Sequence, residues 1–220
     1  MGDHGIRGVA DAGAFVARLA RLDRSLPVRL RSGRSGRTAL WARVPWGVLV
    51  TREVEGPGPG DATASAGDLL TVLAAGGGEL PGRRDAEWRW PLPPAGIQAV
   101  ESVGAAELSR LADAAAGTLR EVTAAGLGGR SVGQRAVRDA LLDHVALIVT
   151  PAQGDPVAVP QRLVQAVSRM GFLGTPDVDG PGARVCVAGR WVGLSAPYGV
   201  AWLQPVRELT VMPIGGHPKG

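Results

Sequence analysis

The densest group of side chains that could do chemistry is R-L-R-S-G-R-S-G-R, at residues 29–37. Its four arginines are Arg29, Arg31, Arg34 and Arg37. A guanidinium pairs with phosphate through two parallel hydrogen bonds, and glycine lets backbone amides approach an anion closely. The segment also suits a solvated hairpin loop, because Lys219 is the single lysine among 24 basic residues and arginine is therefore common everywhere. We favour the loop and keep the four arginines as candidates for binding phosphate or another anion.

Aromatic residues form the second group with binding potential. The chain has six tryptophans against two phenylalanines and one tyrosine, and all six lie in or beside runs of β-forming residues. Packing in the core is the expected role of such rings, although exposed rings would form a binding surface. Trp46 and Tyr198 are the best candidates for contact with a partner, because V-P-W-G-V (44–48) and A-P-Y-G-V (196–200) both predict turns.

Residues for catalysis or metal binding do not form a recognisable pattern. A lone cysteine, Cys186, lies in an alternating apolar run and is expected to be a buried, unreactive thiol. The chain contains no His-Glu-x-x-His pattern. The segment G-L-G-G-R-S-V-G (126–133) follows a predicted helix rather than a strand and lacks a phosphate-binding lysine, so it predicts a connector between helices. We therefore predict a non-enzyme with no cofactor and no metal.

The predicted helices and strands indicate the α+β class. Apolar residues at helical spacing predict helices at about 10–23, 67–75, 104–124, 131–144 and 160–170. β-like runs occupy 28–31, 38–44, 48–54, 86–90, 97–100, 184–187, 190–195 and 200–205. The run A-L-I-V-T (146–150) suits either a last helical turn or a strand. The expected architecture is antiparallel three-stranded meanders packed by helices.

Two parts of the chain resemble each other. F-V-A-R-L-A-R-L-D (15–23) and L-V-Q-A-V-S-R-M-G (163–171) place apolar residues at the same positions, and each precedes three β-like runs. In both copies the last two runs are joined by Pro-aromatic-Gly. This predicts a helix-plus-three-strand unit that occurs twice, at 15–54 and 163–206, although turn chemistry arising twice would give the same pentapeptides.

The composition and the segments rich in glycine and proline predict how the chain is organised. An apolar share of 45% and a charged share of 20% are those of a globular protein. We expect a disordered N-terminus at 1–9, an α+β half at 10–124, a helical and three-stranded half at 125–206 packed against it, and a tail at 207–220. The abundance of Arg, Ala, Gly and Pro indicates a high-GC bacterium, for example an actinobacterium. No secretory signal or membrane span is evident, which predicts a cytoplasmic protein.

The order of elements in the N-terminal half carries a family resemblance. Helix, three strands, helix, two strands, helix over residues 10–124 is similar to the type III secretion chaperone-like fold. The resemblance implies a protein that binds a peptide or a protein partner without chemistry, commonly as a dimer. We therefore expect a non-catalytic interaction, adaptor or chaperone-like regulatory protein, with a protein partner or self-association and a possible homodimer.

A DNA-binding regulator is the alternative. From residue 104 the order helix, helix, helix, hairpin is also that of a winged helix. Helix 160–170 would then be the recognition helix, and hairpin 184–195 would be the wing. The side chains that would reach DNA are Gln161, Arg162, Gln165, Arg169 and Arg190. The formal net charge of +4 permits such a partner but does not argue for one.

Overall fold

A large antiparallel sheet forms the centre of the protein. The structure is a computed structural model, and it describes residues 2–125, 134–151, 154–175 and 182–204. The strands of the large sheet are β1 (Pro27–Ser32), β2 (Arg37–Arg43), β3 (Leu49–Glu55), β4 (Asp61–Ser65), β5 (Gln98–Val103), β8 (Ala183–Ala188), β9 (Trp191–Ala196) and β10 (Gly199–Leu203). A separate hairpin contains β6 (Val145–Val149) and β7 (Val157–Pro160). The helices are α1 (Val9–Leu22), α2 (Ala66–Ala74), α3 (Ala105–Ala125), α4 (Gln134–Asp143) and α5 (Gln161–Arg169).

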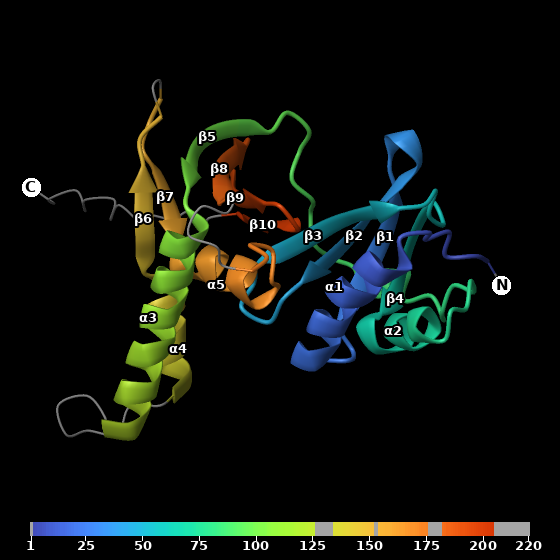
Figure 1. Cartoon of the computed structure of the whole chain (residues 1–220), viewed down its shortest axis with the longest axis horizontal. Coiled ribbons are helices and arrows are strands. Elements are labelled where there is room, and N and C mark those ends of the chain that lie inside the picture. The colour runs from blue at the N-terminus through green and yellow to red at the C-terminus, as the bar shows by residue number, and fades with distance from the viewer. Residues whose placement is uncertain (1, 126–133, 152–153, 176–181, 205–220) are drawn as a thin grey trace, which may run out of the picture.

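Two meanders join edge to edge to make this sheet. The strand order is β4-β1-β2-β3-β10-β9-β8-β5, and every neighbouring pair is antiparallel. At the centre, β3 pairs with β10 so that Val50 lies opposite Ala201. Helix α1 precedes the meander β1–β3, and α5 precedes the meander β8–β10. The α+β class and the antiparallel meanders packed by helices are therefore confirmed. Each helix-plus-three-strand unit contributes one strand of the central pair β3–β10 (Figure 1).

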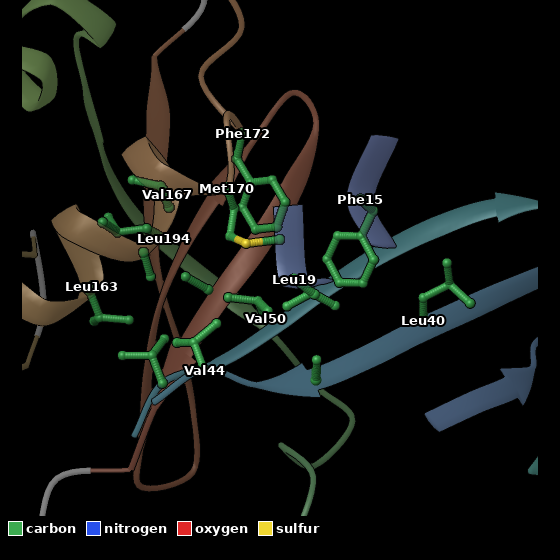
Figure 2. Close-up of a cluster of buried hydrophobic side chains, with 14 of the residues drawn as sticks. Phe15, Leu19, Leu40, Val44, Val50, Leu163, Val167, Met170, Phe172 and Leu194 are labelled. Atoms are coloured by element: carbon green, nitrogen blue, oxygen red, sulfur yellow. The ribbon is translucent and has the colours of Figure 1, made fainter. Parts of the chain in front are cut away.

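The main core lies between one face of this sheet and the helices α1 and α5. Leu19 of α1 and Val167 of α5 are fully buried, because each helix turns one apolar stripe toward the sheet. Phe15 of α1 and Phe172, just after α5, stack with their ring centroids 6.2 Å apart. Figure 2 shows these rings converging from the two units above strand residues such as Val50 and Leu194. The two units thus share one core.

A second core covers the opposite face of the sheet. Its buried residues are Leu49, Cys186, Ala188, Trp191 and Trp202, and Trp41, Trp88, Trp90, Leu92 and Val200 pack against them. Five of the six tryptophans contribute to this layer, so the expectation of tryptophan packing in the core is confirmed for them. The chain between α2 and β5 forms a strap over these residues.

The strap corrects one predicted strand. Residues 86–90 were expected to form a strand, but Asp85–Glu87 form a single 3-10 turn and the residues after it are irregular. Prolines at 91, 93 and 94 remove backbone donors that a strand would need. The indole Nε1 of Trp88 donates to the Trp90 carbonyl at 2.8 Å, which lets both rings pack on the sheet without strand pairing.

The strap also closes the outer edge of β4. The Arg84 amide donates to the Thr63 carbonyl at 2.7 Å, and the Thr63 amide donates to Oδ1 of Asp85 at 2.7 Å. These bonds satisfy backbone groups that would otherwise form an open sheet edge. Strand β4 itself was not predicted, because its five residues D-A-T-A-S lack large β-forming side chains.

The N-terminal residues differ from the expected disorder. Residues 2–8 are extended along the end of α2, where His4 and Ile6 are buried. The His4 amide donates to the Gly78 carbonyl at 2.9 Å, and its ring Nε2 lies 2.8 Å from the Gly77 carbonyl oxygen. Ile6 donates its amide to the other ring nitrogen of His4, so the imidazole fixes this segment from both sides.

The remaining described helices and strands lie where the sequence predicted them, apart from the hairpin β6–β7. The undecided run at 146–150 forms strand β6, and its partner β7 was not predicted. The start of the helix expected at 131 and the tail expected at 207–220 lie outside the described residues. No helix of the described chain is long and apolar enough to cross a membrane.

Candidate functional site

The Pro-aromatic-Gly turn of the first unit docks onto the second unit. Trp46 lies in the β2–β3 turn, and its Nε1 donates to the Arg162 carbonyl of α5 at 3.2 Å. In return, Nη1 of Arg162 donates to the Trp46 carbonyl at 3.0 Å. The guanidinium of Arg169, two helical turns along α5, lies 5.5 Å from the Trp46 ring centroid. Trp46 therefore belongs to the contact between the two units.

The equivalent turn of the second unit docks onto the first. Tyr198 lies between β9 and β10, and its carbonyl accepts a 2.9 Å bond from Nη1 of Arg52 on β3. The same guanidinium lies 5.4 Å from the Tyr198 ring centroid and pairs with Asp11 of α1 at 2.7 Å. Each turn thus presents its ring to arginine from the other unit. Tyr198 remains 48% exposed.

Beside Trp46 the surface opens into a cleft of about 750 Å³ between α3, α4, α5 and the β2–β3 turn. We call it the arginine cleft. Its charged lining residues are Arg43, Arg120, Arg135, Arg138, Arg162, Arg169, Asp139 and Asp143. Six guanidinium groups against two carboxylates leave an excess of four positive charges, which equals the formal net charge of +4 of the whole chain. The lining of this cleft is therefore strongly basic.

Ion pairs neutralise only part of this charge. Arg162 pairs with Asp143, while Arg135 and Arg138 share Asp139 at 3.9 and 3.5 Å. Burial is the main cause that lowers the pKa of Arg162, and the nearby charge of Arg43 acts in the same direction. The other three arginines of the lining have no carboxylate within 4.0 Å among the residues that the structure describes; they are Arg43, Arg120 and Arg169.

Apart from Gln161 and Gln165, the rest of the lining is apolar. Leu119 of α3 and Leu141 and Leu142 of α4 are half-buried. We call these leucines, together with Pro45 and Trp46, the apolar floor of the cleft. Both carboxylates are engaged by arginine, and the described lining contains no serine, cysteine or histidine. Such a site can bind negative and apolar groups, but it holds no nucleophile activated by a base.

Helix α5 corrects the winged-helix hypothesis. Its residues Leu163 and Val167 are fully buried against the sheet, and the hairpin β8–β9 lies inside that sheet instead of projecting as a wing. Gln161 and Gln165 donate their side-chain amides to the carbonyls of Leu111 and Ala112 at 3.1 and 2.9 Å. These two side chains therefore fasten α5 to α3 and do not form a free recognition face. Arg190 is exposed at the β8–β9 turn and does not line the cleft.

The three described arginines of residues 29–37 lie close to carboxylates of neighbouring strands. Arg29 donates two hydrogen bonds of 2.7 Å to Asp61, which also lies 3.5 Å from Arg31. Arg37 pairs with Glu53 at 3.3 Å. The bond to Arg29 is the main cause that lowers the pKa of Asp61, and the same bond raises the pKa of Arg29. The side chain of Arg34 lies outside the described part of the chain.

Four cleft arginines were not singled out from the sequence: Arg43, Arg120, Arg135 and Arg138. In the predicted helix 131–144, the three-residue spacing of Arg135 and Arg138 placed them on one face. Nothing in that spacing indicated that the face would meet Trp46, because their separation in sequence is large and the contact depends on how the two units join. The candidates that the structure does bring together are Trp46, Gln161, Arg162, Gln165 and Arg169.

The fold is shared with bacterial DNA polymerase sliding clamps. The sliding clamp of Caulobacter crescentus aligns with a TM-score of 0.50 and 12% identity over 89% of this chain and 63% of the clamp. The Bartonella birtlesii sliding clamp, DNA polymerase III subunit beta, bound to griselimycin, aligns with a TM-score of 0.50 and 13% identity over 96% of this chain and 68% of the clamp. This chain thus spans 63% of the length of the first of these clamps.

Family models divide the chain at the strap. Residues 92–208 match DUF8185, a domain of unknown function, and the chain belongs to that family. Residues 5–90 match DUF8010, another domain of unknown function. No curated protein matches the sequence. The arginine cleft takes Arg43 and Trp46 from the first matched segment and α3, α4 and α5 from the second.

Proposed function

We propose that this protein is a non-catalytic interaction or adaptor protein that holds a segment of a protein partner in the arginine cleft. The observation that carries the proposal is the lining: six guanidinium groups and an apolar floor favour binding, and no side chain among the described lining residues is placed for covalent chemistry. The proposal assigns the protein no enzymatic activity.

The clamp likeness supports a binding role. The Bartonella birtlesii clamp is a subunit of DNA polymerase III and is bound to griselimycin in its structure. We extend that kind of role to this chain, together with a cytoplasmic location in a high-GC bacterium. Self-association as a homodimer and chaperone-like peptide binding are finer forms of the same proposal, and each predicts a measurable complex.

A photo-crosslinking experiment tests the proposal with two neighbouring positions. Ala116 of α3 lines the cleft, while Ala114 is exposed on the same helix outside the lining. A benzophenone amino acid is placed at either position of the full chain, which is then irradiated in cells. We expect a discrete protein adduct from position 116 and none from position 114. Equal labelling from both positions, or no adduct at all, would refute the cleft as a protein-docking site.

DNA binding is the second candidate function, now through the arginine cleft instead of a winged helix. Among the described residues, the guanidinium groups of Arg120 and Arg169 have no carboxylate partner, which favours phosphate binding, and the structures with a similar fold are DNA polymerase sliding clamps. A gel shift with random genomic DNA over a salt series tests it, because phosphate binding by arginine weakens steeply as salt rises. Without salt-sensitive binding at micromolar protein, the DNA candidate fails.

A further inference from the structure

We infer that the occupant of the arginine cleft is an acidic amphipathic helix of the partner protein. The inference rests on the proposed protein-binding function and adds the chemistry and the conformation of the bound segment. Three features of the cleft carry it: the distribution of charge, the apolar floor, and the helical elements that form the walls.

Charge selects an acidic segment. Arg120 and Arg169 have no carboxylate partner in the described structure, and Arg135 and Arg138 share only one. Glutamate or aspartate side chains of a partner would supply the missing counter-charges, and a guanidinium binds a carboxylate through paired hydrogen bonds. A basic or neutral segment would leave this excess of positive charge uncompensated.

The apolar floor selects a segment that is not acidic all round. Leu119, Leu141 and Leu142 are half-buried and line the same cleft as the arginines, and Trp46 belongs to the same apolar floor. An occupant gains from the hydrophobic effect only if it presents apolar side chains on the face that contacts these residues. Acidic residues on one face and leucine-like residues on another define an amphipathic segment.

The helical walls select a helical occupant. Helices α3 and α4 lie side by side (Figure 1) and make contact with each other and with α5. Helical walls satisfy their own backbone groups and offer no strand edge, and the Trp46 carbonyl already accepts from Arg162. An extended peptide would leave its amides and carbonyls without partners here, whereas a helix satisfies them internally.

The same features disfavour nucleic acid as the occupant. Asp139 and Asp143 lie in the wall of the cleft, where they would repel phosphate groups. The leucines of the floor would face a sugar-phosphate backbone that has no apolar side chains to offer. A protein segment can place acidic residues beside the arginines and keep them away from the two aspartates, so it suits the lining better.

A binding titration with designed peptides tests the inference on the full chain. The first peptide has about 18 residues, with leucine on one face of a helix and glutamate on the other. The second peptide has the same composition in scrambled order. Fluorescence anisotropy reports affinity, and circular dichroism reports helix formation on binding. We expect the amphipathic peptide to bind with a gain in helicity, to weaken as salt rises, and to exceed the scrambled peptide by about tenfold in affinity.

Charge reversal in the protein locates the site. Arg135→Glu with Arg138→Glu should weaken peptide binding by about tenfold or more, because each attraction becomes a repulsion. Arg110→Glu with Arg190→Glu changes the net charge equally at exposed positions outside the lining, and it should leave affinity within about twofold. Unchanged thermal midpoints show that both variants remain folded.

Three results would overturn the inference: equal binding of the scrambled peptide, binding without a gain in helicity, or tighter binding of a single-stranded DNA oligonucleotide that displaces the peptide. If one of these occurs while position 116 still crosslinks to a protein, the acidic-helix inference is wrong and the protein-docking function stands. If the crosslink is also missing, both are wrong.

Discussion

The two Pro-aromatic-Gly turns allow a controlled comparison of how glycine is required in each unit. Gly47 and Gly199 occupy the same position in Pro-Trp-Gly and Pro-Tyr-Gly, yet their surroundings differ. A Cβ at Gly199 would lie 2.6 Å from Cε1 of Phe172, whereas a Cβ at Gly47 would meet only the ends of two arginine side chains, Nη2 of Arg43 at 3.1 Å and Nη1 of Arg162 at 3.5 Å. We therefore predict that Gly199→Ala destabilises the protein more than Gly47→Ala.

The structure sets the sizes of the two effects. Gly47 has a φ of +87°, so alanine there costs about 1–2 kcal/mol for a left-handed backbone while Arg43 swings away. At Gly199 the obstacle is Phe172, which is 1% exposed and stacked on Phe15, so the ring cannot move without disturbing the core. Overpacking of that kind costs about 1–3 kcal/mol. With a φ of +155° adding backbone strain, we expect a loss of about 2–4 kcal/mol for Gly199→Ala.

Urea unfolding followed by tryptophan fluorescence measures both losses. Phe172→Leu should relieve the crowding, so Gly199→Ala should cost about 1 kcal/mol less in that background, while the cost of Gly47→Ala should stay the same. Equal losses for the two alanine variants, or no coupling between position 199 and Phe172, would refute this account of why the second turn requires glycine.

Three further predictions concern single side chains. Thr51→Val should leave stability unchanged or raise it by about 1 kcal/mol in thermal unfolding, because the buried Thr51 hydroxyl has no hydrogen-bond partner in the described structure. A clear loss of stability would show that this hydroxyl does make a hydrogen bond in the folded protein. Burial raises the pKa of the Cys186 thiol to about 11, so iodoacetamide should react slowly at pH 8 until denaturant is added, and fast reaction of the folded chain would contradict the buried position. Arg29 lowers the pKa of Asp61 below its unfolded value, so the pair stabilises the fold above about pH 4 and loses that effect as pH falls through the lower folded pKa. Asp61→Asn should cost at most about 1 kcal/mol at pH 7, because the pair is partly exposed, and the difference from the parent should vanish in acid; a constant difference would exclude the charge effect.

Local sequence patterns predicted most of the helices and strands, because the formation of these elements depends on residues that are close in sequence. The helical spacing of Phe15 and Leu19 predicted α1. At the start of α2 the Ser65 side chain accepts from the Asp68 amide, a local cap between residues three apart in sequence. Strand β4 and the strap were missed for a different reason. The identity of β4 as a strand depends on its pairing with β1, and Trp88 and Trp90 alternate as in a strand while their backbone has no strand partner.

The site was predictable only in part because it is formed by tertiary contacts. Arg162 and Arg169 were identified as binding candidates, but their role as DNA-reading residues depended on a free α5, and the buried Gln161 shows that this helix is packed. Trp46 was identified from its turn alone. No local pattern could place Trp46 beside Arg162, because 116 residues separate them.

The two docked turns explain why the cleft occurs on one side of the molecule. At the Tyr198 turn, Arg52 is already neutralised by Asp11 of the short neighbouring helix α1, so that side holds a closed ion pair. At the Trp46 turn, the long helix α3 and helix α4 stand beside α5 and contribute further arginines without enough carboxylates to balance them. The repeated unit therefore provides the frame in both places, and helices α3 and α4 form the arginine cleft beside one copy. Because Arg43 and Trp46 come from the first family segment and these helices from the second, neither segment alone contains the complete cleft.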